Sequence, residues 1–316
     1  MSAEKVIVVA GPTATGKTKL GILLAQRFSG EIVSADSMQL YRRMDIGTAK
    51  ATEAERAAAP HHMLDVAEPD ESYSVSRYVE QAARCCDDIL ARGHTPVIVG
   101  GTGLYIDSLL SGRDFAGREE GEEELRGSLN ARYDALGGEA MLRELAAFDP
   151  ERAAKLHPSD RRRIVRAIEI YRLTGETISA HDARTKALPP RYDAARIVLG
   201  FRDRSELYAR IDKRVDDMVA AGLFDEVAGL LQSGLSPEST AMQAIGYKEA
   251  AAALAGAIGR DEAIALIKQN SRRYAKRQIT WFSRWDDALF LNWEGTPDFE
   301  KALRISTEFL TARGLS

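Results

Sequence analysis

The stretch Gly11-Pro12-Thr13-Ala14-Thr15-Gly16-Lys17-Thr18 matches the phosphate-binding pattern G-x-x-x-x-G-K-[ST] at every position. The apolar run of residues 6–10 precedes it, and residues 20–28 follow with apolar side chains at helical spacing. In this context the loop N–H groups converge on one centre, while Lys17 supplies a charge and Thr18 a hydroxyl for Mg²⁺. The stretch therefore predicts a strand, a loop that suits a di- or triphosphate, and a helix. A glycine-rich turn that merely starts a helix is the alternative.

The composition is that of an ordinary globular protein. Of its 316 residues, 45% are hydrophobic and 28% are charged, which is enough for one large core and a smaller appendage. No apolar run approaches the length of a membrane span and no leader pattern precedes the first strand, so we expect a cytoplasmic protein without membrane contact. With a net charge of −4, any polyanion must be bound by a local patch. The neighbouring Cys85 and Cys86 suit neither an ordinary disulfide nor zinc.

A carboxylate follows the second apolar run. Residues 31–35 predict a short buried strand that ends at Asp36. In open α/β sheets, ligands bind beyond the carboxyl ends of the strands, and Gly11–Lys17 lies at that same edge. We interpret Asp36 as a general base or a carboxylate near a metal, with a helix N-cap as the alternative. The irregular segments 37–41 and 44–50 come next and are suited to carrying specificity.

A histidine pair raises the question of a metal site. His61 and His62 lie close to Asp65, but adjacent residues of a strand point to opposite faces, so only one histidine can face a common site. The pair therefore favours loop packing or substrate positioning over metal ligation.

The third apolar run, residues 96–99, ends in Gly100-Gly101. Motor and switch NTPases end the equivalent strand in an Asp that holds Mg²⁺. The glycines therefore disfavour a nucleotide-hydrolysing machine. Two classes remain: phosphoryl transfer to a small molecule, and a transferase whose loop holds a diphosphate leaving group.

Residues 113–195 change in character. Helical patterns with little β-branched content predict an inserted, mostly helical subdomain, which divides a P-loop core into residues 1–112 and 196–316. The acidic run 118–124 near its start is interpreted as a solvated helix beginning.

The insertion contains a basic helix. A capping Ser159 or Asp160 precedes it, and Arg162 and Arg166 lie at i, i+4 with Arg163 beside them. This face either binds a polyanion or is a solvated face paired with acidic residues.

The chain returns to the sheet with a fourth apolar run, residues 197–201. The helix after it carries Arg210 and Arg214 at i, i+4, and guanidinium groups recognise phosphate oxygens bidentately. We favour a diphosphate clamp by one of these arginines. The alternative is pairing with Asp203, Glu206 and Asp217.

Residues 268–284 form the strongest basic segment, with no acidic residue and with aromatic residues interleaved. In a chain of negative net charge this predicts a polyanion-binding helix. Aromatic residues at helical spacing are more often core than base-stacking platforms, so we assign Trp281 and Trp285 to packing. The cations are Lys268, Arg272, Arg273, Lys276, Arg277 and Arg284.

Together these motifs resemble the bacterial form of the tRNA dimethylallyltransferases, or tRNA isopentenyltransferases, over nearly the whole chain. Their order and spacing make the resemblance specific. The motifs are Gly11 to Thr18, Asp36 to Tyr41, Met44 to Lys50, Pro60-His61-His62, Gly100 to Tyr105, Ile245-Gly246-Tyr247-Lys248 and Lys276 to Trp281.

The resemblance implies an α/β, P-loop NTPase-like core with a central parallel sheet flanked by helices. It implies transfer of the dimethylallyl group from dimethylallyl diphosphate to N6 of the adenine 3′ to the tRNA anticodon, with Mg²⁺ as cofactor. Negative charge grows on the leaving diphosphate, so the loop, Lys17, Thr18 with Mg²⁺ and Arg210 or Arg214 would stabilise it. Asp36 would take the proton of the amine, and the adenine must be flipped out of its stack.

The same resemblance assigns further residues. Thr102 would lie beside the reacting amine, and we expect a monomer that binds the anticodon stem-loop. The residues expected to contact tRNA are Asp36, Ser37, Met38, Gln39, Thr102, Arg161, Arg162, Arg163, Ile164, Val165, Arg166, Arg272, Arg273, Lys276 and Arg277.

Three other functions remain as alternatives. A small-molecule P-loop kinase leaves the basic helix unexplained. An adenylate isopentenyltransferase needs neither the insertion nor residues 268–284, and an RNA-binding regulator with a vestigial nucleotide site does not need the intact Lys17-Thr18 pair.

Overall fold

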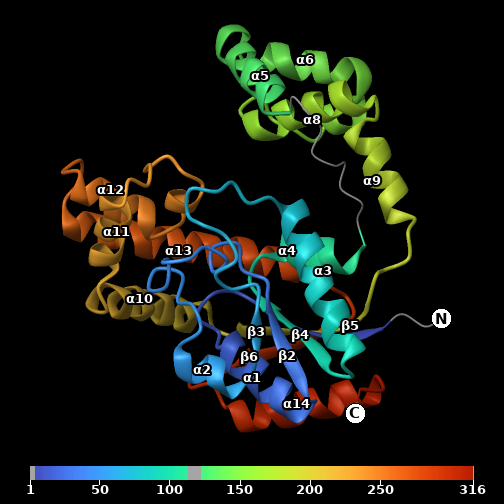
Figure 1. Ribbon diagram of the computed structural model, residues 1–316, viewed down its shortest axis with the longest axis vertical. Helices are drawn as coiled ribbons and strands as arrows, with labels where there is room; N and C mark the ends of the chain where they lie inside the picture. Colours follow the sequence, from blue (N-terminus) through green and yellow to red (C-terminus); the bar gives the residue numbers. More distant parts are fainter. Residues whose placement is uncertain (1–3, 113–121, 316) are drawn as a thin grey trace. The chain divides into compact units, whose positions relative to one another are not determined.

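The computed structural model describes residues 4–112 and 122–315. Its centre is a six-stranded sheet in the order β3-β2-β4-β1-β5-β6, and every neighbouring pair is parallel (Figure 1). The predicted α/β fold with a central parallel sheet is therefore confirmed. The strands are β1 (Lys5–Ala10), β2 (Gly30–Ser34), β3 (His61–His62), β4 (Thr95–Gly100), β5 (Asp193–Phe201) and β6 (Leu289–Trp293).

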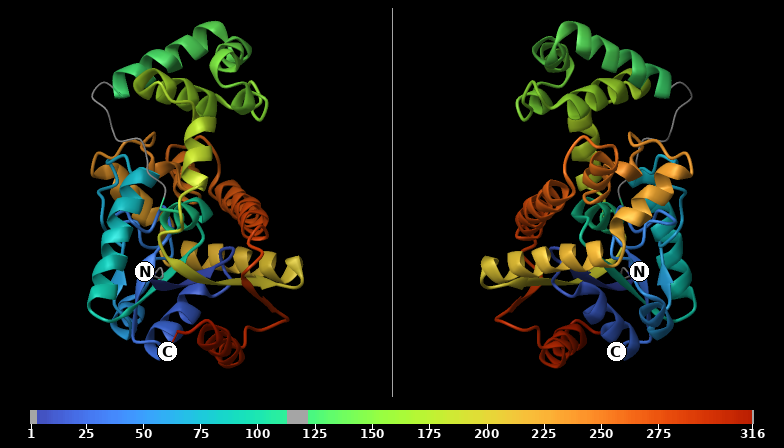
Figure 2. Two further views of the ribbon diagram at one scale, coloured as in Figure 1. Left: turned by 90° about the vertical axis from the view of Figure 1, so that its right-hand side faces the viewer. Right: turned by 90° about the vertical axis from the view of Figure 1, so that its left-hand side faces the viewer.

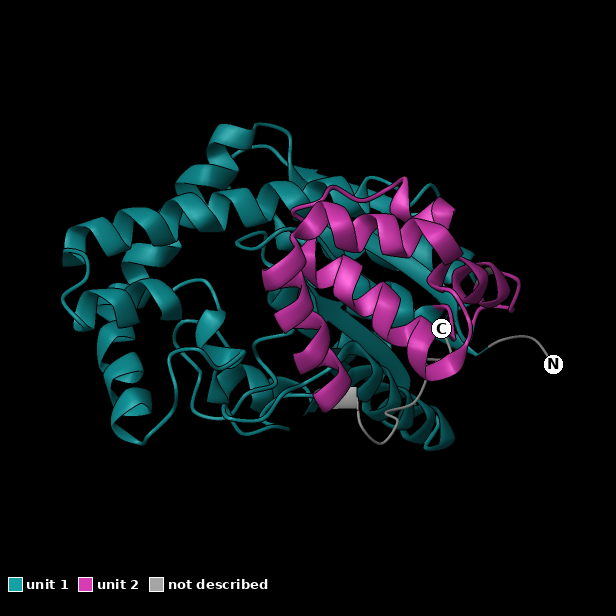
Figure 3. Ribbon diagram, turned by 90° about the horizontal axis from the view of Figure 1, so that it is seen from above, with its two compact units in different colours: residues 1–110, 191–316 teal, residues 111–190 magenta. Residues whose placement is uncertain are grey.

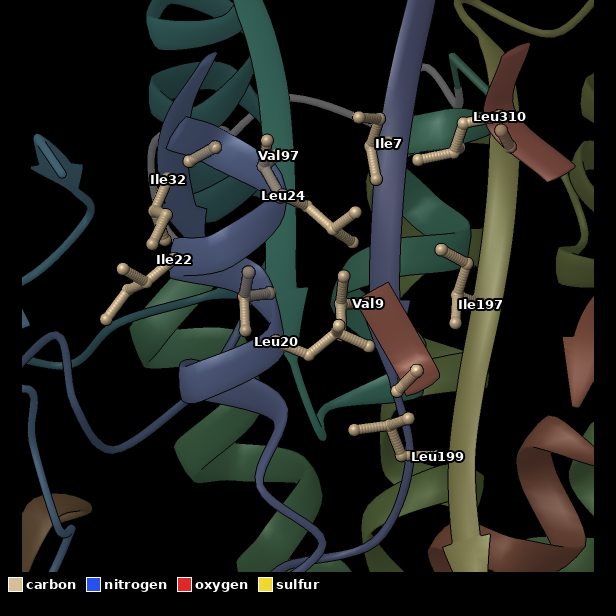
Figure 4. Close-up of a cluster of buried hydrophobic side chains, with 14 of the residues drawn as sticks. Ile7, Val9, Leu20, Ile22, Leu24, Ile32, Val97, Ile197, Leu199 and Leu310 are labelled. Atoms are coloured by element: carbon tan, nitrogen blue, oxygen red, sulfur yellow. The ribbon is translucent and has the colours of Figure 1, made fainter. Parts of the chain in front are cut away.

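Each of the four inner strands contains a short apolar run, as expected for a sheet with helices on both faces. On one face, Leu20 and Leu24 of α1 (Lys17–Arg27) lie among Val9 and Val97 (Figure 4). Leu310 of α14 (Phe299–Ala312) belongs to the same buried cluster. The edge strands β3 and β6 are less buried, and their sequences lack a continuous apolar run.

The remaining helices of the core connect and flank these strands. No helix among the described residues is long and apolar enough to cross a membrane. The helices are α2 (Glu53–Ala58), α3 (Val75–Ala91), α4 (Gly103–Leu110), α10 (Arg204–Ala220), α11 (Leu223–Gln232), the short 3₁₀ helix η1 (Ala241–Gln243), α12 (Tyr247–Leu254) and α13 (Arg260–Phe282).

The chain divides into two compact units (Figure 3). Unit 1 comprises residues 1–110 and 191–316, and unit 2 comprises residues 111–190. The boundary expected at residue 195 falls inside β5, which begins at Asp193. The acidic run 118–124 is expected to begin a solvated helix. Residues 118–121 of that run lie outside the described residues.

Unit 2 has a small helical core of its own. Leu129, Met141, Leu145, Ile164 and Ile168 are fully buried and pack together. The unit consists of α5 (Glu122–Leu136), α6 (Gly138–Phe148), α7 (Pro150–Ala153), α8 (Arg161–Thr174) and α9 (Ile178–Lys186).

The phosphate loop between β1 and α1 has a backbone that depends on glycine at its first position. Gly11 has φ +137°, and a Cβ there would lie 2.3 Å from the carbonyl oxygen of Leu199 on β5. Thr15 is fully buried and its hydroxyl donates to the Pro12 carbonyl at 2.8 Å. The loop is thus fixed from within and against the neighbouring strand.

Gly11→Ala is expected to lower the free energy of unfolding by about 3 kcal/mol, because it adds both backbone strain and a backbone collision. Gly93 is the matched control: its φ is +75°, but a Cβ would meet nothing within 4 Å. Gly93→Ala should cost only about 1 kcal/mol of left-handed strain. Urea unfolding of the two variants measures the difference, and equal losses would contradict the role of the Leu199 contact.

Candidate active site

The carboxyl edge of the sheet opens into a cavity of about 360 Å³ in unit 1. Segments far apart in the sequence line it: the phosphate loop, the turn after β2, α10, the residues around Gly246, and α13. From the predicted site, the residues on its wall are Thr13, Ala14, Gly16, Lys17, Thr18, Asp36, Ser37, Met38, Gln39, Arg214 and Arg277. Gly11, Pro12 and Thr15 lie behind the wall as parts of the loop's scaffold.

Lys17 is the first residue of α1, and its Nζ donates to the Pro12 carbonyl at 2.8 Å. The pKa of Lys17 is lowered to about 7, mostly by burial and in part by the nearby cation of Arg214, while the Asp36 carboxylate acts in the opposite direction. An anion entering the cavity would favour the charged form of Lys17. The side chain of Lys17 therefore lies across the mouth of the loop, and an anionic ligand would stabilise its protonated form.

Asp36 stands directly beyond β2, as its position in the sequence predicts. Its Oδ1 accepts the N–H groups of Met38 at 2.9 Å and Gln39 at 3.4 Å. Both bonds go to one oxygen, so the other, Oδ2, is the oxygen available to accept a proton. The carboxylate therefore caps a turn, rather than the helix considered as the alternative, while it lines the cavity.

Thr102 is fastened to the turn that carries Asp36. Its N–H donates to the Ala35 carbonyl at 3.1 Å, and its Oγ1 accepts the N–H of Ser37 at 3.1 Å. Tyr274 of α13 lies close to Asp36, and burial together with the Asp36 charge raises the pKa of its phenol to about 12. The hydroxyl of Tyr274 therefore stays protonated at neutral pH.

The two predicted clamp arginines have different surroundings. Arg214 lines the cavity, is half-buried, and interacts electrostatically with Asp36 and Lys17. Its Nε is buried and has no hydrogen-bond partner among the described residues. Arg210 is exposed and donates from Nε to the Ala14 carbonyl at 3.2 Å, on the outside of the loop. The structure therefore favours Arg214 as the anion ligand and Arg210 as a support of the loop.

The acidic residues considered as partners of these arginines are engaged elsewhere. Asp203 accepts a hydrogen bond from the N–H of Ser205, Glu206 accepts one from the N–H of Gly295, and Asp217 forms an ion pair with Lys213.

The basic segment at 268–284 is less free than its composition suggests. Lys268 and Arg272 form ion pairs with Asp216 and Asp212 of α10, which packs against α13 (Figure 2). Arg284 lies beyond the end of α13. The prediction that all six cations are available for a polyanion is therefore wrong, and Arg272 is a structural ion-pair residue. Within residues 268–282 of α13, the exposed cations are Arg273, Lys276 and Arg277.

The two tryptophans of this segment serve packing, as predicted. The indole N–H of Trp281 donates to Asp107 Oδ2 at 2.8 Å, and that of Trp285 donates to Asp107 Oδ1 at 3.0 Å. Trp285 is buried and stacks edge-on against Phe282. Together they fasten the end of α13 to α4.

In unit 2 the predicted tRNA-binding residues of α8 divide into three groups. Ile164 and Val165 are buried in the core of the unit, so the expectation that their side chains contact tRNA is wrong. Arg161 is bound to Asn130 and Asp134, and Arg166 pairs with the fully buried Glu169. The exposed arginines of the set are Arg162 and Arg163.

The histidine pair divides between two environments. His61 lines the cavity, its Nδ1 lies 2.8 Å from the Ala59 carbonyl, and burial lowers its pKa. His62 Nε2 lies 2.7 Å from Oε2 of the buried Glu31. The two rings therefore do not face one site, as their adjacency in a strand predicts.

Several residues that shape the cavity escape sequence reasoning. Glu226 of α11 accepts the N–H groups of Asp45, Ile46 and Gly47, the last at 3.2 Å, together with the hydroxyl of Tyr247. This carboxylate holds the loop from which Gly47 lines the cavity. No periodic or motif signal marks Glu226, because its main-chain partners lie about 180 positions away in the sequence.

The donor set at the loop fits a magnesium ion that arrives with a diphosphate. Thr18 supplies a hydroxyl and Asp36 a carboxylate on the same cavity wall. No group of three or more His, Cys, Asp or Glu side chains suited to a metal occurs within residues 4–112 and 122–315. Magnesium is usually bound by one or two protein oxygens together with phosphate oxygens and water, and the Thr18 hydroxyl is an oxygen of this kind.

Two family models match the chain: the IPP transferase model covers residues 39–285, and the isopentenyl transferase model covers residues 4–65. A tRNA dimethylallyltransferase of Thermoanaerobacter sp. (strain X514) is 46% identical over 299 residues, which is 94% of each chain. The tRNA dimethylallyltransferase 2 of Geotalea uraniireducens is 47% identical over 294 residues, 93% of each chain.

Solved structures agree with these matches. The full-length tRNA isopentenylpyrophosphate transferase of Bacillus halodurans is 40% identical with a TM-score of 0.73, covering 98% of this chain and 96% of that one. A eukaryotic dimethylallyltransferase acting on tRNA is 30% identical with a TM-score of 0.82, covering 99% and 81%. Sequence, fold and the residues around the cavity thus agree, and the chain belongs to the IPP transferase family.

Proposed function

We propose that this enzyme transfers the dimethylallyl group of dimethylallyl diphosphate to N6 of the adenine 3′ to the anticodon in tRNA and releases diphosphate. The observation that carries the proposal is the meeting of two groups in one cavity: the phosphate loop with Lys17 and Arg214, and the carboxylate of Asp36. The first group suits a departing diphosphate. The second suits an amine that must lose a proton.

The reaction forms the N6–C1 and Asp36 O–H bonds and breaks the C1–O and N6–H bonds. N6 of the adenine attacks C1 of the dimethylallyl group, the C1–O bond breaks, and its electron pair leaves with the diphosphate. The N–H groups of the loop, Lys17 and Arg214 would stabilise the charge that grows on that leaving group. Oδ2 of Asp36 would take the N6 proton while Oδ1 stays bound to the turn.

We propose Mg²⁺ as the cofactor, held by the hydroxyl of Thr18. When bound, the ion would neutralise part of the diphosphate charge. We also propose that the anticodon stem-loop of the tRNA is contacted by Arg273, Lys276 and Arg277, by Ser37 to Gln39, and by Arg162 and Arg163. We propose that the reaction takes place in the cytoplasm. A single chain supplies every group named here, so a monomer is sufficient for the reaction.

One assay tests the function. The protein is incubated with Mg²⁺ and labelled dimethylallyl diphosphate, and either unmodified tRNA or AMP is added as acceptor. Label in tRNA supports the proposal. Label in AMP alone, or no transfer together with ATP turnover on a small acceptor, would overturn it.

The pKa of Lys17, near 7 in the free enzyme, predicts how diphosphate binding depends on pH. The protonated lysine binds the anion, so affinity for inorganic diphosphate should fall by up to about tenfold for each pH unit above that pKa. Diphosphate itself also titrates, so the comparison is with Lys17→Arg, whose guanidinium stays charged. Calorimetry at constant Mg²⁺ measures the ratio of the two affinities, and a ratio independent of pH would contradict the assignment.

A further inference from the structure

Gln278 of α13 makes a buried bridge between two loops of the active site. Its side chain is 5% exposed. Its Oε1 accepts the N–H of Thr13 in the phosphate loop at 3.0 Å, and its Nε2 donates to the carbonyl of Gly101 at 2.9 Å. The two partners are main-chain groups of opposite kind, so they fix which way the carboxamide points.

The fit around this bridge is close. A Cβ on Gly101 would lie 2.2 Å from the Nε2 of Gln278, so the carboxamide reaches the main chain only because that residue is glycine. Gly101 immediately precedes Thr102, which is bonded to the turn that carries Asp36. One amide therefore connects the leaving-group side of the cavity with the side that holds the base.

The helix that bears Gln278 has a second, solvent-facing side. Arg273, Lys276 and Arg277 are exposed there, whereas Ala275 and Phe282 are buried beside Gln278. Farther along, Trp281 and Trp285 fix the helix to Asp107. The helix is thus bonded to both loops close to the end that the tryptophans hold, and this gives the bridge a rigid base.

We propose that Gln278 is a positioning residue that sets the distance between the phosphate loop and the Asp36 turn, acting through Thr13 and Gly101. This rests on the function proposed above, since it assigns a role within that reaction. Gln278 touches neither reacting group in this proposal. It keeps the nucleophile and the leaving group at the distance that the reaction requires. Small changes in that distance slow a reaction strongly.

The chemistry of the bridge gives a specific test with Gln278→Glu. The introduced carboxyl can still accept from Thr13, but it can donate to the Gly101 carbonyl only when it is protonated. Burial and the facing carbonyl oxygen disfavour its charged form and raise the pKa of the new carboxyl. Protonation therefore restores the bridge at low pH, and deprotonation breaks it at high pH.

The measurement is the single-turnover rate of transfer to tRNA at saturating substrates, expressed as the ratio of Gln278→Glu to wild type. We expect the ratio to rise about tenfold from about pH 8.5 to about pH 6. Gln278→Leu should be slower than wild type by about tenfold at every pH in that range. A buried carboxyl with a raised pKa also destabilises the folded state as the pH rises, so circular dichroism at each pH is needed to show that Gln278→Glu is folded where its rate is compared.

Gln81 supplies the matched control. It is a half-buried glutamine of α3 that accepts the hydroxyl of Tyr73 at 2.7 Å and lies outside the cavity lining. Gln81→Glu should leave the ratio flat. A flat ratio for Gln278→Glu, with wild type active on tRNA, overturns the inference and leaves the proposed function standing. If wild type transfers no label, the proposed function fails. The affinity for inorganic diphosphate is then measured in place of the rate, and the pH dependence of its ratio between Gln278→Glu and wild type decides the inference.

Discussion

Asp36→Ala is expected to slow transfer of the dimethylallyl group to tRNA by about a hundredfold or more, an effect much larger than its loss of tRNA affinity. The reason lies in the division of labour between its two oxygens. Oδ1 holds the turn at residues 36–39, and Oδ2 is the oxygen available for the N6 proton. Single-turnover rates at saturating substrates, with tRNA binding measured separately, test both halves of the expectation.

Asp36→Asn is the matched control for the turn. Its carboxamide keeps an oxygen that can accept the N–H of Met38, but it cannot act as a base. It should therefore be about as slow as Asp36→Ala while it binds tRNA like wild type. If tRNA binding collapses in the alanine variant and single-turnover chemistry survives, Asp36 has a structural role and the base lies elsewhere.

The parts of the fold that were predictable from sequence are those with a local signal. The phosphate loop has a fixed pattern, and the inner strands are apolar runs bounded by turns, so four strands and the helix after the loop could be placed. The edge strands could not. β3 is only two residues long, and in β6 buried and exposed positions alternate around the polar Asn292.

The site was predictable where chemistry follows a strand end, as at Asp36, and much less so where contacts join distant segments. Sequence alone left Arg210 and Arg214 equivalent, because both lie on one turn of the same helix. Only the packing of α10 against the loop sends Arg214 into the cavity and Arg210 to the outside. The roles of Gln278 and Glu226 depend in the same way on main-chain groups 177 to 265 positions away.

Ile164 and Val165 were assigned to the tRNA surface because the basic helix was treated as a whole, without separating its buried face from its exposed face. Ile164 and Val165 recur with Ile168 at the spacing of a buried stripe, so the same sequence already contained the signal that they are core residues. Arg272 was misassigned because its partner, Asp212, comes from a different helix.

Arg214→Ala is expected to lower both the affinity for inorganic diphosphate and the rate of transfer, the rate by about a hundredfold to a thousandfold. Its guanidinium lines the cavity beside Lys17, and its Nε is buried without a hydrogen-bond partner among the described residues. A buried charged donor without a partner is costly to the free enzyme, and an anion in the cavity would supply the partner. Calorimetry with inorganic diphosphate and single-turnover rates measure the two effects.

Arg210→Ala is the control from the same face of α10, and it should lose less than about tenfold, because its exposed side chain only supports the Ala14 carbonyl. The pKa of Lys17 gives a second, independent signature. Arg214 helps to lower that pKa, so its removal raises the pKa and moves the fall in diphosphate affinity to higher pH. Equal losses in the two variants, with no shift in the pH dependence, would mean that Arg214 does not bind the diphosphate. The clamp would then consist of Lys17 and the N–H groups of the loop alone.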